Sequence, residues 1–119
     1  MNSFRKTTKL LFQASVLMAS VSFAQAVEPE VRFPKKHFAF FEAYCLDCHD
    51  TDTQKGKVDL EALSFNVTSI EQAELWQKVL DAMNAGAMPP EKTPQPKNAE
   101  KADFLEHLAQ TLVLAPKTP

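Results

Sequence analysis

The chain has 119 residues and a formal net charge of −2 at pH 7, from 13 basic and 15 acidic side chains. A protein that binds nucleic acid through its phosphates needs lysine and arginine clustered on one face, and this sequence has no such cluster. We therefore exclude a nucleic-acid partner.

Residues 1–26 are typical of a signal peptide for export. Basic residues lie within positions 5–9, residues 10–23 are mainly apolar, and Ala24-Gln25-Ala26 fits the small-residue rule for cleavage. The apolar stretch of 14 residues is shorter than the roughly 20 that cross a bilayer, which disfavours an uncleaved anchor. We expect cleavage after Ala26, a periplasmic or otherwise exported protein, and no stable membrane insertion afterwards.

The expected mature chain is a single small domain. Removal of residues 1–26 leaves 93 residues, and the loss of three basic residues leaves 10 basic against 15 acidic side chains, a net charge of −5. We expect an irregular lead-in at 27–36, which contains two prolines, one domain at 37–115 and a tail at 116–119.

A first helix is predicted from Lys36 to about His49, where the polar run 50–56 ends it. Apolar residues recur along it at three- and four-residue spacing. They are Phe38, Phe41, Tyr44 and Cys45. A loop then extends to about Thr68, with apolar side chains that anchor it to the core. These are Val58, Leu60, Leu63 and Phe65.

A second helix is predicted at about 70–85. Ser69 and Gln72 have the spacing of a capping box, and Gly86 is a typical stop signal. Trp76 and Met83 lie on its apolar stripe and are expected in the core. The following Ala87-Met88-Pro89-Pro90 cannot be helical, because proline excludes the preceding residue from helical geometry.

A third helix is predicted after the connector 91–97, with Asn98 as its cap and Pro116 just beyond its end. Its apolar face consists of Phe104, Leu105, Leu108, Leu112 and Val113. No strand pattern appears, so the fold class is all-α, with three main helices and long loops. A chain this small has a thin core, which a large apolar cofactor would complete.

Cys45-Leu46-Asp47-Cys48-His49 has the C-x-x-C-H pattern of covalent haem attachment. The two thiols add to the two vinyl groups of the porphyrin, and the adjacent histidine supplies an axial nitrogen to the iron. The segment therefore predicts one covalent haem c held by Cys45, Cys48 and His49.

Other uses of the two cysteines fit less well. A disulfide between residues three apart closes only a tiny loop, and a thioredoxin-type dithiol belongs near a βαβ pattern that is absent here. Zinc needs four ligands, and the spacing of the remaining histidines, His37 and His107, suits no zinc signature. A dithiol remains the alternative if no haem is bound.

The sixth iron ligand is predicted to be Met88, because its proline-rich segment is stiff and a thioether binds haem iron. Met83 is expected to be ordinary core instead, and His107 a partly exposed surface residue. A histidine ligand or an open sixth position stay as alternatives.

These motifs resemble a small class I cytochrome c over most of residues 37–114. The run Tyr44 to Asp50, the run Lys55 to Leu60, the tryptophan helix and Gly86-Ala87-Met88-Pro89-Pro90 resemble, more narrowly, the planctomycete-type cytochrome c domain. The resemblance implies His49 and Met88 as axial ligands. It also implies that Phe41 packs against Phe104 or Leu105 where the first and last helices cross.

The function expected from this pattern is one-electron transfer with redox partner proteins. The chain would then be an electron carrier and not an enzyme in its own right. The alternative is a haem-based sensor or catalytic haem domain with an open or labile sixth position, although His37 and His107 are expected to be isolated and to offer no acid–base pair.

Overall fold

The structure, a computed structural model, describes residues 22, 24 and 30–117. Most of the expected signal peptide, the start of the lead-in and the last two residues of the expected tail lie outside these residues. The described chain consists of helices and long loops, and its extended segments pair only at an isolated bridge between Arg32 and Asn66. The all-α fold with three main helices is confirmed. None of the described helices has the length and apolar character needed to cross a membrane.

The first main helix is one continuous run with changing geometry. It comprises the 3₁₀ turn η1 (Lys35–His37), α1 (Phe38–Phe41), the π-helical η2 (Glu42–Leu46) and α2 (Asp47–His49). The predicted helix is therefore present, but its middle is wound as a π-helix, which apolar periodicity does not reveal. Short π segments inside helices often occur at functional sites, and this one contains Cys45.

Helix α3 (Ile70–Asn84) begins and ends as predicted, to within one residue. The Ser69 hydroxyl accepts a hydrogen bond from the Gln72 backbone N–H at 3.3 Å, and the Gln72 side chain accepts one from the Ser69 N–H at 3.3 Å. At the other end, Gly86 has a φ of 72°, in the left-handed region that favours glycine. Both signals are local, which is why the sequence reveals them.

Helix α4 (Asn98–Leu114) begins one residue earlier than expected, at the residue that was predicted to cap it. Asn98 is already its first residue, while Lys97 holds the cap position with an extended backbone and makes no capping hydrogen bond, so the predicted cap was wrong. Val113, expected on the apolar face, is 68% exposed. Thr111 is buried instead, because its hydroxyl can donate to the His107 carbonyl at 2.8 Å.

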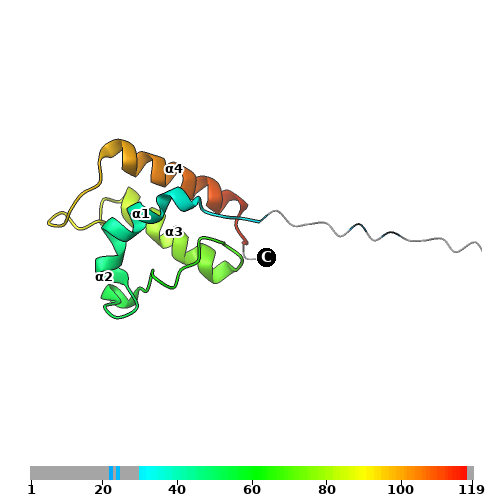
Figure 1. The fold of residues 1–119 in the computed structure, drawn as a ribbon, viewed down its shortest axis with the longest axis horizontal. Helices are drawn as coiled ribbons and strands as arrows, with labels where there is room; N and C mark the ends of the chain where they lie inside the picture. Colours follow the sequence, from blue (N-terminus) through cyan, green and yellow to red (C-terminus); the bar gives the residue numbers. More distant parts are fainter. Residues whose placement is uncertain (1–21, 23, 25–29, 118–119) are drawn as a thin grey trace, which may run out of the picture.

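Figure 1 shows α3 and α4 side by side, with α1 lying across them. An aromatic core fills the crossing. The ring of Phe40 stacks on Phe104, whereas Phe41 packs against Phe65 and Trp76. The ring contact expected between Phe41 and Phe104 is thus made by the neighbouring Phe40 instead, since both phenylalanines are buried and take different neighbours. A contact of Phe41 with Leu105, the other expected counterpart, stays a prediction.

Trp76 is fully buried, as expected of a core residue. Its indole N–H donates to the Ser64 carbonyl at 3.0 Å, which ties α3 to the long loop. Met83 is likewise buried.

Candidate functional site

His49 closes the first helical run and is held from both sides by the loop that follows. Its ring Nδ1 lies 3.2 Å from the Val58 carbonyl, and its own carbonyl accepts a hydrogen bond from the Leu60 N–H at 2.7 Å. A carbonyl can only accept, so Nδ1 carries the proton in this contact. The lone pair is then on Nε2, the nitrogen that can bind a metal. Proteins commonly orient a metal-binding imidazole by a hydrogen bond from its other ring nitrogen, as Nδ1 makes here to Val58.

Cys45 and Cys48 are both free thiols and both partly buried. They lie in the π segment and in α2, respectively. Burial raises the pKa of the Cys45 thiol to about 12. Thiol–disulfide chemistry depends on the thiolate and therefore on a lowered pKa, so this environment does not suit a dithiol of the thioredoxin type.

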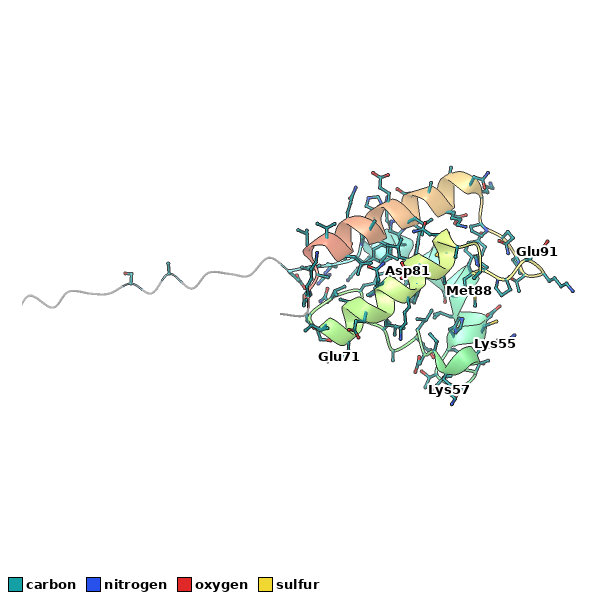
Figure 2. The ribbon with its side chains drawn as sticks, turned by 180° about the vertical axis from the view of Figure 1, so that it is seen from behind. Lys55, Lys57, Glu71, Asp81, Met88 and Glu91 are labelled. Carbon is teal, nitrogen blue, oxygen red and sulfur yellow. The ribbon has the colours of Figure 1, made fainter. Side chains whose placement is uncertain are left out.

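Met88 lies on a tight turn at the end of α3. The backbone N–H groups of Ala87 and Met88 both donate to the Ala82 carbonyl, at 2.9 and 3.2 Å. The Met88–Pro89 peptide bond is cis, and Pro89 is buried. Figure 2 shows Met88 near the end of α3, on the side of the segment that carries Lys55.

Gln95 holds the same turn from the connector. Its side-chain amide donates to the carbonyls of Pro89, Pro90 and Thr93, at 3.3, 2.8 and 3.1 Å. No local sequence signal marks this role, because the amide acts only once the connector has folded back on the proline pair.

Two adjoining hollows bring the four predicted site residues together. One, of about 120 Å³, is lined mainly by apolar side chains together with Cys45, His49 and Met88. The other, of about 340 Å³, is lined by the same three residues and by Cys48. Residues more than 40 positions apart in the sequence thus face one space.

The wall of the smaller hollow comes from every main part of the fold except α4. Phe40 and Tyr44 contribute from the first helical run, and Val58 and Leu60 from the loop. Helix α3 contributes Val79, Ala82 and Met83. The buried core residue Met83 therefore also borders the site.

The chemistry of these residues fits a haem. Apolar walls suit the porphyrin, two thiols are available for attachment, and an imidazole nitrogen and a thioether are suitable donors for iron. His37 and His107 line neither hollow. The two histidines were expected to be isolated from each other. This expectation was wrong, because both lie beside Asp103. His107 is partly exposed, as predicted.

Residues 45–92 match the model of the family described as Planctomycete cytochrome C. The match begins at the first cysteine of the attachment motif and extends past the Met88 turn, and it confirms the family resemblance over that segment. The family is one of cytochromes c, which implies haem c and its iron. No curated protein and no solved structure shows significant similarity to the chain.

Proposed function

We propose that this chain, whose residues 45–92 match the Planctomycete cytochrome C family, is an exported one-electron carrier. Cys45 and Cys48 attach one haem c, and His49 and Met88 are its axial ligands. The alternative is a sensor or catalytic haem domain in which Met88 leaves the iron.

The observation that carries the proposal is that Cys45, His49 and Met88 line one apolar hollow. Met88 comes from a different element from the other two, so its presence there does not follow from the attachment motif. A nitrogen donor and a thioether donor facing one space can complete the two axial positions of a six-coordinate iron.

The surrounding residues favour electron transfer because they hold both ligands in fixed positions. Val58 fixes the ring of His49 through Nδ1, while Ala82 and Gln95 hold the turn that carries Met88. A haem bound here supplies an iron that changes between its ferric and ferrous forms. Ligands that do not move keep the reorganisation small when an electron enters or leaves.

Partner binding is expected at the exposed rim of the site. Met88 is 37% exposed, and Figure 2 shows Lys55 and Glu91 near it on opposite sides. The larger hollow is bordered by one acidic and one basic residue, Asp47 and Lys55, so this rim carries charges of both signs. A small, mixed-charge rim suits a transient contact with another redox protein.

The experiment is expression in a bacterial host that attaches haem c during export, followed by intact mass measurement of the purified protein. We expect cleavage after Ala26 and a mass gain of one haem. Cys45→Ser and Cys48→Ser should each retain a single thioether bond at most, and the double variant should retain no covalent haem. Wild-type protein without covalent haem in that host would contradict the proposal and leave the dithiol alternative.

A further inference from the structure

His37, Asp103 and His107 form a second cluster that borders neither hollow. His37 is the last residue of η1, and Asp103 and His107 are one turn apart on α4. His37 Nε2 lies 3.8 Å from one Asp103 carboxylate oxygen, and His107 Nδ1 lies 3.3 Å from the other. One potential ligand atom from each residue lies within 4.8 Å of the others.

His37 is a buried histidine with an unused nitrogen. The residue is 4% exposed, and its buried Nε2 has no hydrogen-bond partner. A buried polar atom without a hydrogen-bond partner lowers the stability of the folded state, and most buried polar atoms in proteins have such a partner. The His37 Nε2 faces Asp103 but lies 3.8 Å from its carboxylate, too far for a hydrogen bond. A group placed between the two side chains would give this nitrogen a partner.

The orientation of the His37 ring is fixed by its aromatic neighbours. Phe33 stacks on it with ring centroids 4.9 Å apart and planes at 12°, and Phe104 meets it nearly edge-on at 5.4 Å. Burial lowers the pKa of His37, which favours the neutral imidazole that binds metals. One ligand of the cluster is thus already oriented by the core.

We propose that His37, Asp103 and His107 bind one divalent transition-metal ion of the zinc class, with water in the remaining position. Two imidazoles and a carboxylate are a typical donor set for Zn²⁺, with bonds of about 2.0 to 2.2 Å. Ligands on a tetrahedral ion are then about 3.3 Å apart. His37 and His107 contact different carboxylate oxygens of Asp103, at 3.8 and 3.3 Å, and the three potential ligand atoms lie within 4.8 Å of one another, so binding requires them to draw together by about 1.5 Å at most.

The side-chain movement needed to bring the three ligand atoms around one ion is expected mainly at His107. Its Nδ1 is 2.8 Å from the Asp103 backbone carbonyl, a contact that the ring leaves when it turns to bind an ion. The side chain is 30% exposed and borders a surface hollow of about 230 Å³ beside Val31 and Gln110. The ring therefore has room to turn, and an ion can reach it from solvent.

Lys36 competes with the ion. Its ammonium group donates to both carboxylate oxygens of Asp103, at 3.0 and 2.9 Å. The pair is exposed, and such ion pairs contribute little to stability, so an ion can displace the lysine. The site should accordingly bind zinc more weakly than one without a competing lysine. Removal of Lys36 should strengthen binding.

The test is titration of the purified haem-loaded protein with zinc chloride by isothermal calorimetry, after treatment with a chelator and its removal. The wild type should bind one equivalent. His107→Ala and Asp103→Asn should each weaken binding at least about tenfold, because the first removes one of the three ligands and the second replaces the charged carboxylate ligand by a neutral amide. Glu106→Gln is the matched control on α4, and it should bind as the wild type does.

Lys36→Met gives a test in the opposite direction. This exposed substitution should tighten zinc binding about threefold or more, a gain that general disruption of the fold would not produce. The site is rejected if the wild type binds no zinc, if His107→Ala and Asp103→Asn bind like the wild type, or if Lys36→Met does not bind more tightly. The result is independent of the proposed electron transfer, because none of these residues borders the haem hollows.

Discussion

The ring of Phe40 stacks on the ring of Phe104, with centroids 4.3 Å apart and planes at 22°. Phe104 is fully buried on α4, and Phe40 also borders the smaller hollow. The packing of the first helical run on α4 therefore supports one wall of the site, although α4 itself contributes no residue to it.

Replacement of Phe104 tests this support. Phe104→Ala should lower the free energy of unfolding by about 3 to 5 kcal/mol, the usual cost of removing a buried phenylalanine ring. Urea denaturation of the haem-loaded protein measures it. Phe38→Ala, at a residue that is 52% exposed, is the control and should change stability by no more than about 0.5 kcal/mol. Equal losses in the two variants would contradict this account of the core.

The two glycines with positive φ allow a paired comparison. Gly86 and Gly56 have φ values of 72° and 67°, and an added Cβ would meet no atom within 4 Å at either position. Alanine at either site should therefore cost about 1 kcal/mol from backbone strain alone. Only Gly86→Ala should also weaken the iron–thioether absorption band, because Gly86 leads into the Met88 turn. An unaltered band in Gly86→Ala would show that the turn tolerates the strain.

Gln95 should control how easily Met88 leaves the iron. Gln95→Ala removes the hydrogen bonds to the carbonyls of Pro89, Pro90 and Thr93. The affinity of the haem-loaded protein for added imidazole should then rise by up to about tenfold, as expected from the loss of one to two net hydrogen bonds. Gln110→Ala removes a surface amide that donates to Glu106, away from the Met88 turn, and should leave imidazole binding unchanged.

Features that depend on residues close together in the sequence were predicted correctly. The ends of α3 follow from Ser69, Gln72 and Gly86, and the attachment motif follows from five consecutive residues. The sequence did not predict which of two adjacent phenylalanines stacks on Phe104, because both are apolar and the choice depends on the relative rotation of two packed helices.

The residues that were missed act only through the tertiary fold. His37 and His107 were expected to be isolated, since they are 70 positions apart in the sequence, yet the packing of the first helical run on α4 places their ring centroids 5.0 Å apart. The π turn that contains Cys45 keeps the same apolar residues as an ordinary helix, so periodicity does not distinguish the two.

The measurement that tests the central claim most directly is the absorption spectrum of the oxidised haem-loaded protein, with Met88→Ala and Met83→Leu compared. Both methionines border the smaller hollow, but only Met88 is proposed to bind iron. The account predicts a low-spin spectrum with an iron–thioether band that is lost in Met88→Ala and kept in Met83→Leu. A high-spin wild-type spectrum, or a band that survives in Met88→Ala, would contradict it and favour a sensor or catalytic haem domain or another sixth ligand.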